Sequence, residues 1–553
     1  MLLASLLVAY SNLLLASQVI AQSNSADVVD VGYAKYLGNR TFPNSVAYLG
    51  IPYAEPPLGE RRFRAPLPLN TTRIAEEANG EVLDATEYPD FCIQGSIGIG
   101  DAGGAGSEDC LKINVYAPAG AQKGDNLPVL FYIHGGGYVF GNPRNWPFDH
   151  WIEQSPNVVV VSVYYRLKAF GFLSIPELSD PANGDLNAGF LDQIQALRWV
   201  KENIASFGGD PNKVTINGES AGGGSVQHHL VANVGGETLF HGAIAQSVAR
   251  SVTPDPEQVK PAFEFFASRA GCDAETVVDQ LACLRNASVS ALARAQDTTF
   301  NGTYRNFNPV VDGKVIVGHP TTLIKEGKFV KVPLIVGATS NETVVGGTGD
   351  PAPILRGIFP ALTDEDIGDI LEAYPEDDFD SPDQRLRVIT GENLLICAVV
   401  GQREILGKVF SEAPKSFAYR YNQPNPTTTN TTAGTGHAAE NWMMFLGSNT
   451  FTNGTNTFTP MTPVETAFAE ELIAYWLSFV RSGDPNTYKL ERSPEWPRYS
   501  VAPGSEDSSL QRIVLQQDPG DTTTESGSFL EREPENQTHR CAVVASKSER
   551  QQN

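Results

Sequence analysis

The sequence predicts an α/β fold with a large, mostly parallel central sheet, helices on both faces and inserted loops. Strand-like runs that are apolar on both faces alternate with amphipathic helical segments, a pattern typical of a parallel sheet covered by helices. No internal repeat and no Pro/Ser-rich linker divides the 553 residues, although the length alone would allow two to four domains. We therefore predict one large domain.

The first half of the chain contains a clear succession of elements. Residues 129–133 and 158–165 are apolar runs rich in Val, Ile and Tyr, which indicates buried strands. Residues 187–205 carry apolar side chains at three- and four-residue steps, which predicts an amphipathic helix that ends at 207–211. Residues 214–216 form the next strand. Strand, helix and strand with short loops indicate the β-α-β units of a doubly wound sheet.

The second half continues this pattern with longer insertions. Residues 333–337 and 416–421 are two later predicted strands. Residues 465–481 predict a long amphipathic helix that a Ser-Gly-Asp-Pro sequence closes. The polar Thr/Asn/Gly tracts at 427–435 and 450–457 are interpreted as surface loops.

Charge and the N-terminal segment narrow the class of protein. The chain has 40 Lys and Arg against 64 Asp and Glu, and this net charge of −24 argues against nucleic acid or anionic membrane surfaces as partners. Residues 1–21 carry no charge and end in Ala21, a small residue suited to signal-peptidase cleavage; polar interruptions make the run a poor membrane anchor. We predict a secreted protein whose mature domain is 22–553, with a polar C-terminal tail from about 519 and no stable membrane association.

Cysteines and glycosylation sequons agree with export. The six cysteines include two pairs that would each close a short loop, as exported chains permit, namely Cys92/Cys110 and Cys272/Cys283. Cys397 and Cys541 are left over, and spacing does not decide whether they pair or stay buried as thiols. N-x-S/T sequons predict a glycoprotein, with candidate sites at Asn39, Asn70, Asn286, Asn301, Asn430, Asn453 and Asn536.

A Gly-x-Ser-x-Gly pentapeptide marks a candidate nucleophile. Residues 218–222 read Gly-Glu-Ser-Ala-Gly and follow the predicted strand at 214–216. In a nucleophile elbow, the serine occupies a sharp, strained strand-to-helix turn that projects its Oγ, and flanking side chains would crowd that turn. The setting therefore favours Ser220 as a nucleophile over a serine in an ordinary glycine-rich turn.

A serine nucleophile needs a base, and the base needs a carboxylate to orient it. With this elbow, the order along the chain is nucleophile, acid, histidine. His437 lies in a loop beyond the predicted strand at 416–421, and Glu342 lies just past the one ending at 337. We predict these two as base and acid. Asp312, the chief rival acid, is interpreted as a turn residue.

An ester carbonyl also needs donors for its developing oxyanion. The sequence His134-Gly135-Gly136-Gly137 follows the strand at 129–133, and its glycines allow backbone N–H groups to approach a ligand closely. The N–H of Ala221, directly after the serine, would be a further donor.

With these motifs in place, the chain resembles the type-B carboxylesterase/lipase family, which includes cholinesterases and secreted fungal lipases, from about residue 48 to 499. Its marks are Leu49–Pro57, Ser107–Leu111, the three-glycine loop, Tyr165-Arg166, Asn187 with Asp192-Gln193, Phe207–Pro211 and Gly218–Gly223. The resemblance implies the alpha/beta-hydrolase fold and ester hydrolysis without a metal or an organic cofactor.

The resemblance also implies roles for individual residues. The implied catalytic residues are Ser220, Glu342 and His437, and the implied oxyanion hole is Gly136, Gly137 and Ala221. The implied disulfides are Cys92–Cys110 and Cys272–Cys283. Glu219, Ser247 and Glu440 match a second buried polar cluster, which either holds a proton, because neighbouring carboxylates resist joint ionisation, or serves as scaffolding for the histidine loop.

Three features depart from the family. The loop between Cys92 and Cys110 is short, glycine-rich and free of Trp, which weakens the expectation of interfacial activation and disfavours choline esters. Val248 stands where glycine is usual, and its branched side chain would narrow the pocket. Asn341-Glu342-Thr343 is a further sequon, and we expect Asn341 to stay unglycosylated if Glu342 is buried.

We therefore expect a secreted serine carboxylic-ester hydrolase that acts on small-molecule or lipid esters through an acyl-enzyme. One alternative is a lipase or sterol esterase for long acyl chains. Another is an esterase for hydroxycinnamate (feruloyl-type) esters. A non-catalytic adhesion module is disfavoured, because such relatives typically lack the nucleophile. The sequence leaves the oligomeric state open.

Overall fold

The computed structural model describes residues 27–96, 104–299, 307–343, 345–398, 414–427, 434–450, 456–499 and 511–553. The predicted signal peptide and the sequons at Asn301, Asn430 and Asn453 lie outside the described residues, as do residues 97–103 of the loop between Cys92 and Cys110.

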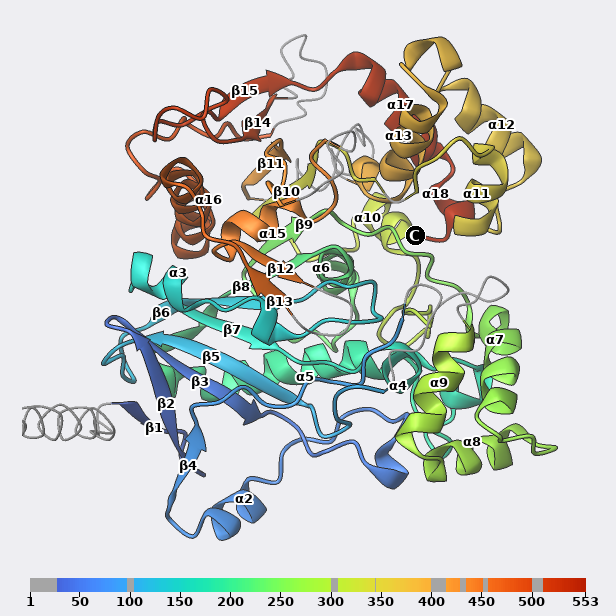
Figure 1. Ribbon diagram of the computed structural model, residues 1–553. Helices are drawn as coiled ribbons and strands as arrows, with labels where there is room; N and C mark the ends of the chain where they lie inside the picture. Colours follow the sequence, from blue (N-terminus) through green and yellow to red (C-terminus); the bar gives the residue numbers. More distant parts are fainter. Residues whose placement is uncertain are drawn as a thin grey trace, which may run out of the picture.

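A 13-stranded mixed sheet forms the centre of the molecule (Figure 1). Its strands are β1 (Val28–Asp30), β2 (Lys35–Phe42), β3 (Ser45–Pro52), β4 (Val82–Ala85), β5 (Lys112–Pro118), β6 (Leu127–Ile133), β7 (Val159–Val163), β8 (Gly209–Glu219), β9 (Gly242–Gln246), β10 (Leu334–Thr339), β11 (Ser416–Tyr421), β14 (Gln511–Leu515) and β15 (Phe529–Arg532). The order is β1-β2-β3-β5-β7-β6-β8-β9-β10-β11-β14-β15, and β4 pairs with β2. All pairings from β7 to β14 along this order are parallel, which confirms the predicted sheet type.

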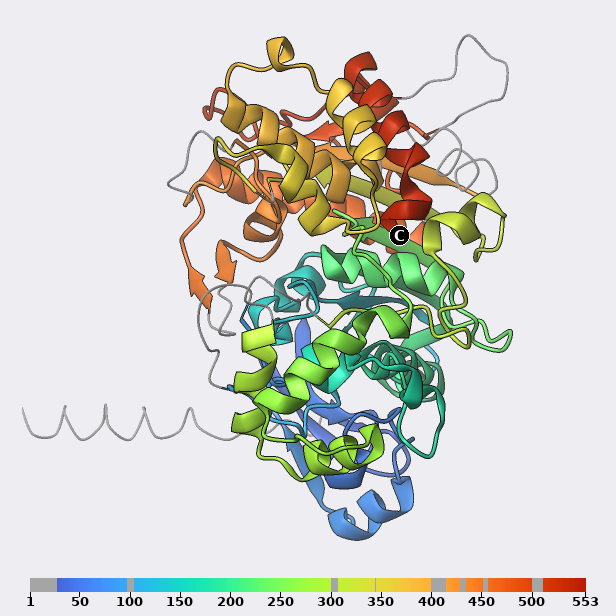
Figure 2. The same cartoon turned by 90° about the vertical axis from the view of Figure 1, so that its right-hand side faces the viewer.

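Helices cover the sheet and extend the domain beyond it. They are α2 (Thr71–Ala78), α3 (Asp149–Gln154), α4 (Lys168–Phe172), α5 (Ala188–Asn203), α6 (Ala221–Val231), α7 (Pro256–Arg269), α8 (Val277–Asn286), α9 (Val289–Thr299), α10 (Pro320–Lys325), α11 (Pro351–Ile358), α12 (Asp364–Glu372), α13 (Pro382–Leu394), α15 (Ala439–Met444), α16 (Pro463–Ser482), α17 (Glu535–Ser546) and α18 (Ser548–Gln551). Figure 2 shows α11, α12 and α13 beside the C-terminal helices, away from α7, α8 and α9.

The central strands contribute to two hydrophobic cores because successive side chains point to opposite faces. In β6, Phe131 belongs to the core that includes Ile194 of α5 and Val226 of α6. The adjacent Leu130 belongs to the core formed with α3, α15 and α16, where Trp476 is fully buried. This arrangement explains why these strands read as continuous apolar runs in the sequence.

Local signals set the helix ends close to the predicted positions. In α16, Thr462 and Glu465 form a capping box and Gly483 ends the helix in the left-handed conformation. At the start of α5, Asn187 donates to the carboxylate of Asp312, which also accepts three backbone N–H groups of its own turn. Asp312 is therefore a turn residue, as predicted.

The segment from about residue 519, predicted as a polar tail, is instead part of the folded domain. β15 pairs antiparallel with β14, and α17 packs against α12 and α13. Cys541 of α17 is buried and joined to Cys397, and its neighbour Val544 is buried as well. A disulfide and ion pairs with distant parts of the chain, which local polarity does not reveal, hold this segment in the fold.

One of the two polar tracts predicted as surface loops, residues 450–457, is flanked by short strands. Ser448–Thr450 (β12) and Asn456–Phe458 (β13) form a two-stranded antiparallel sheet where the sequence predicted only a loop.

The structure contains the disulfides Cys92–Cys110, Cys272–Cys283 and Cys397–Cys541. The third pair resolves the state of the two cysteines that spacing left open.

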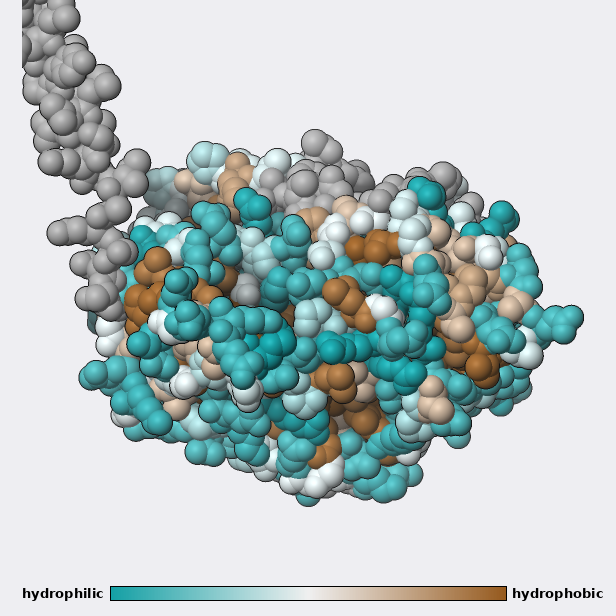
Figure 3. Space-filling model, turned by 90° about the horizontal axis from the view of Figure 1, so that it is seen from below, coloured by the Kyte–Doolittle hydropathy of each residue, from teal (hydrophilic) through white to brown (hydrophobic). Residues whose placement is uncertain are grey.

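The surface seen in Figure 3 is largely hydrophilic, with apolar side chains in separate patches. Over the described ranges, none of the helices combines the length and apolar character that a bilayer-spanning segment requires.

Candidate active site

Ser220 occupies the sharp turn between β8 and α6. Its backbone has φ 58° and ψ −121°, a conformation that a residue with a side chain rarely adopts and that is strained. A Cβ at Gly218 would overlap the Gly222 backbone, and one at Gly222 would overlap the Ile133 carbonyl oxygen. The two glycines of the pentapeptide are therefore required by close packing, as expected of a nucleophile elbow.

The structure brings Ser220, His437 and Glu342 together from three separate loops. Ser220 Oγ lies 2.8 Å from His437 Nε2. The other ring nitrogen of His437, Nδ1, lies 2.5 Å from Glu342 Oε2. With Nδ1–H donating to the carboxylate, Nε2 is free to accept the serine proton.

Glu342 lies just beyond β10 and is 1% exposed. The Ser247 hydroxyl donates to its Oε1 at 2.5 Å, and the Thr339 N–H donates to the same oxygen at 2.8 Å. Burial alone would raise the pKa of Glu342, but His437 and these hydrogen bonds outweigh it and lower that pKa. Glu342 is thus held as a carboxylate with both oxygens engaged.

His437 precedes α15, in the loop that follows β11. Ala438 turns the chain into the helix with φ 60°. The His437 side chain is 30% exposed, although Glu342 beneath it is fully covered. Burial favours the neutral ring, but the carboxylates of Glu342, Glu219 and Glu440 outweigh it and raise the pKa of His437 above its usual value. The imidazolium is consequently well stabilised at this position.

Glu219 and Glu440 form the second buried cluster that the resemblance implied. Glu219 Oε1 lies 3.5 Å from His437 Nε2, and Asn441 donates to the other carboxylate oxygen at 3.4 Å. Burial, together with the nearby Glu342, raises the pKa of Glu219 to about 7. Burial and the nearby carboxylates of Glu219 and Glu342 raise the pKa of Glu440 to about 8. Ser247, expected in this cluster, contacts Glu342 instead.

The three-glycine loop lies against the elbow. A Cβ at Gly135 would come within 3.0 Å of Ser220 Cβ, which places the loop directly beside the nucleophile. Gly136 and Gly137 have φ values of 99° and 65°, conformations that favour glycine. Ala221 is the first residue of α6, where backbone N–H groups have no acceptor within the helix. These positions suit the predicted oxyanion hole.

Gln94 supports this loop and was missed by the sequence reasoning. Its side chain is fully buried; its Oε1 accepts the Gly141 N–H at 2.7 Å, and its Nε2 donates to the Gly141 carbonyl at 3.0 Å. The next residue, Gly95, donates to Val139 O at 2.9 Å. The disulfide loop thus holds the end of the glycine loop in place. The position of Gln94 two residues after Cys92 was the single hint in the sequence.

The sequon at Asn341 lies beside the candidate acid. Asn341 is exposed although the adjacent Glu342 is buried, and the expectation that Asn341 stays unglycosylated remains a prediction. Among the other described sequons, Asn70, Asn286 and Asn536 are exposed, whereas Asn39 is half-buried and its amide donates to Thr86 O. Glycosylation at these positions stays a prediction.

Within the described residues, the group of side chains with metal-like spacing is Glu392, Cys397 and Cys541. The two cysteines are joined to each other, so they offer no thiolate to an ion.

Comparisons with known proteins place the chain in a family. The carboxylesterase family model matches residues 25–350 and 362–529. Lipase 5 of Diutina rugosa is 33% identical over 521 residues, which cover 85% of this chain and 89% of that protein. Carboxylesterase 1F of Mus musculus is 32% identical over 544 residues, which cover 88% and 91%. The crystal structure of Aspergillus niger EstA superposes with a TM-score of 0.81 at 30% identity and covers 96% of this chain and 100% of that one.

The mostly parallel sheet and the elbow at Ser220 define an alpha/beta-hydrolase. The chain belongs to the carboxylesterase family and is a carboxylic ester hydrolase.

Proposed function

We propose that this ester hydrolase is a secreted serine esterase that forms an acyl-enzyme on Ser220. The observation that carries the proposal is the alignment of Ser220 Oγ, the His437 ring and the Glu342 carboxylate at 2.8 and 2.5 Å. Serine is a weak nucleophile unless a base takes its proton, and this geometry supplies an oriented base.

In the first step, His437 Nε2 takes the hydroxyl proton as Ser220 Oγ attacks the ester carbonyl carbon. The N–H groups of Gly136, Gly137 and Ala221 stabilise the resulting oxyanion. The imidazolium then protonates the leaving alcohol, which departs as the carbonyl re-forms. In the second step, His437 activates a water molecule that attacks the acyl-enzyme and releases the acid. Glu342 stabilises the imidazolium in both steps, and the residues that react need no metal or organic cofactor.

Small-molecule or lipid esters are the proposed substrates. The long-chain alternative, a lipase or sterol esterase, stays open, since relatives in Diutina rugosa and Geotrichum candidum are named lipases. The feruloyl-type alternative also stays open. A series of p-nitrophenyl esters of rising acyl length, run beside methyl ferulate, separates these three substrate classes by their relative kcat/KM.

Export is the second part of the proposal. We infer that residues 1–21 are removed as a signal peptide and that residues 22–553 form one glycosylated extracellular domain. Three disulfides within one chain support an oxidising compartment. Mass spectrometry of the secreted protein would give the N-terminus and the occupied sequons. Retention of the uncleaved protein in the cell would contradict the proposal.

Ser220→Ala tests the catalytic assignment. We expect a loss of at least about 10⁴-fold in kcat on p-nitrophenyl acetate, because the nucleophile is removed. The wild-type enzyme should also be labelled at Ser220 by an organophosphonate, and the variant should not. Substantial turnover by a folded Ser220→Ala variant would overturn the assignment, and an unlabelled wild-type protein would favour the adhesion module.

A further inference from the structure

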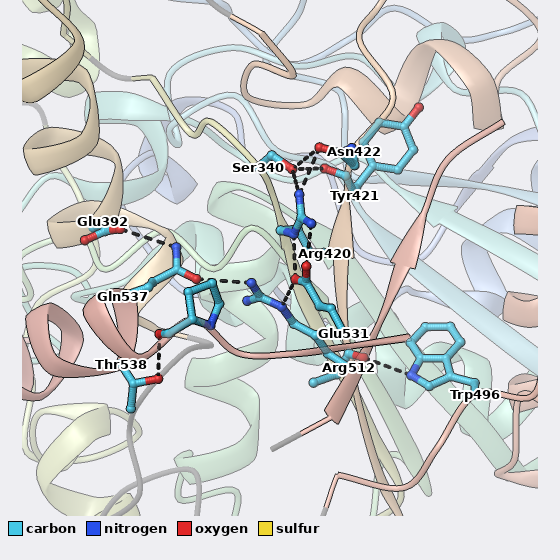
Figure 4. Close-up of polar contacts among 12 residues, drawn as sticks. Ser340, Glu392, Arg420, Tyr421, Asn422, Trp496, Arg512, Glu531, Gln537 and Thr538 are labelled. Atoms are coloured by element: carbon cyan, nitrogen blue, oxygen red, sulfur yellow. Dashed lines mark hydrogen bonds and ion pairs between the residues drawn. The ribbon is translucent and has the colours of Figure 1, made fainter. Parts of the chain in front are cut away.

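A chain of polar contacts links the C-terminal segment to the loop that carries Glu342 (Figure 4). We call residues 339–343 the acid loop. The Arg420 guanidinium donates to Ser340 Oγ at 2.7 Å from its Nη1 atom, and the Ser340 hydroxyl in turn donates to Asn422 Oδ1 at 2.6 Å. The Ser340 N–H also donates to Tyr421 O at 2.9 Å. The acid loop is thus fixed to the end of β11 two residues before Glu342.

Glu531 of β15 is the centre of this chain of contacts. Its two oxygens accept from Arg420 Nε and Nη2 at 2.7 and 2.6 Å. The Oε1 atom also accepts from Arg512 Nε at 2.7 Å. The Glu531 side chain is 16% exposed, and that of Arg512 is 3% exposed. One carboxylate therefore orients two arginines, and one of them holds Ser340.

The contacts also continue from Arg512 to Glu392, whose neighbour Gly391 packs against the acid loop. Arg512 Nη2 donates to Gln537 Oε1 at 3.1 Å, and Gln537 Nε2 donates to Glu392 Oε1 at 3.3 Å. Arg540 donates to both oxygens of Glu392 at 2.7 and 2.6 Å. The residue before Glu392 is Gly391, where a Cβ would overlap the Glu342 carbonyl oxygen. Both ends of the chain of contacts therefore touch the acid loop.

We propose that Glu531 is a positioning residue for catalysis, which sets the acid loop through Arg420 and Ser340 so that Glu342 stays aligned with His437. The proposal rests on the proposed role of Glu342. Displacement of a reacting group by about 1 Å can cost about 10²-fold in rate, so a residue that fixes this loop acts on turnover. This role of Glu531 would also involve the C-terminal segment in catalysis, although the sequence predicted that segment to be a polar tail.

Glu531→Gln is the direct test, because it keeps the shape of the side chain and removes the charge that orients two arginines. We expect kcat to fall about tenfold to a hundredfold with KM within about twofold. Weaker pairing of Glu342 with His437 should also move the acidic limb of the kcat/KM profile to lower pH. Glu219 and Glu440, the other carboxylates that face His437, are unchanged in this variant.

Glu55→Gln is the matched control. Glu55 is 11% exposed and also holds two arginines, Arg73 at 2.7 Å and Arg61 at 3.4 Å, and within the described residues neither of these ion pairs involves the acid loop. We expect its kcat and pH profile to match the wild type. Equal losses in both variants, or an unchanged kcat in folded Glu531→Gln, would overturn the proposal.

A second pair of variants keeps the test decisive if Glu531→Gln does not fold. Ser340→Ala removes the hydroxyl that Arg420 binds, and Ser340→Thr retains one. We expect Ser340→Ala to lower kcat about tenfold with the same pH shift, and Ser340→Thr to restore most of it. If Ser220→Ala is inactive while Ser340→Ala turns over like the wild type, only the positioning role fails. An active Ser220→Ala would instead refute the proposed site.

Discussion

The Ser247 hydroxyl donates to Glu342 Oε1, on the opposite side of the carboxylate from His437. Each oxygen of the Glu342 carboxylate therefore has its own hydrogen-bond partner, and the orientation of the carboxylate does not depend on His437 alone. Ser247 is fully buried. Solvent therefore does not replace its hydroxyl as a donor to Glu342 when Ser247 is substituted by alanine and the surrounding residues keep their positions.

Ser247→Ala should lower kcat about tenfold. A hydrogen bond to a charged group contributes about 1.5–3 kcal/mol, and about 1.4 kcal/mol of barrier corresponds to a factor of ten. Steady-state kinetics on p-nitrophenyl acetate measure the effect. Ser174→Ala, which removes another buried hydroxyl that donates to Phe172 O, is the control and should retain wild-type turnover. Equal losses in the two variants would argue against a specific role for Ser247.

Glu219→Gln should move the acidic limb of the kcat/KM profile to lower pH. His437 acts as a base only when it is neutral, and nearby carboxylates raise its pKa, so activity falls as the pH drops through that value. Removing the carboxylate 3.5 Å from Nε2 lowers the pKa of His437. The exposed Glu237→Gln, which loses only a surface pair with Arg198, should leave the limb in place. A shift of the Glu219→Gln limb to higher pH would contradict this electrostatic account.

Arg62→Ala should lower the free energy of unfolding by about 3–5 kcal/mol, the range for breaking a buried ion pair. Arg62 pairs with Glu108 at 2.7 Å, and its side chain is 7% exposed. It also donates to the carbonyls of residues 284, 285 and 287, so its loss leaves buried acceptors unpaired. Urea denaturation followed by circular dichroism measures the change. The exposed Arg198→Ala should cost about 1 kcal/mol or less.

Removal of the Cys397–Cys541 disulfide should destabilise the protein more than removal of Cys272–Cys283. The first closes a loop with a sequence separation of 144, and the second one of 11. In the chain-entropy account, closing a loop of this greater length stabilises the protein by about 2 kcal/mol more than closing the short one. Paired Cys→Ala variants compared by thermal unfolding test this order. The reverse order would show that native packing, and not loop length, decides the cost.

The sequence was sufficient for those features that chemistry and local packing impose. Gly218 and Gly222 are required by backbone contacts at the elbow, so the motif and its preceding strand predicted the sharp turn at Ser220. Position past a strand end favoured Glu342 as the candidate acid over Asp312, whose carboxylate caps its own turn. Buried parallel strands are apolar on both faces, so the continuous apolar runs in the sequence predicted a mostly parallel sheet.

The features that the sequence did not reveal depend on long-range pairing. β15 is short and partly exposed, and it is held by ion pairs of Glu531 with Arg420 and Arg512. Nothing in its local pattern distinguishes it from a solvated tail. The same holds for Gln94, whose partner Gly141 lies 47 residues away along the chain.

β15 lies at one edge of its sheet and follows the other strands of the described residues along the chain, so it is synthesised after them. A nascent chain that has emerged as far as residue 499 already carries Ser220, Glu342 and His437, yet it lacks both Arg512 and Glu531. With the proposed role of Glu531, the enzyme gains full esterase activity only after residue 531 has been synthesised. The order of synthesis would thereby delay ester cleavage until β15 has joined the sheet.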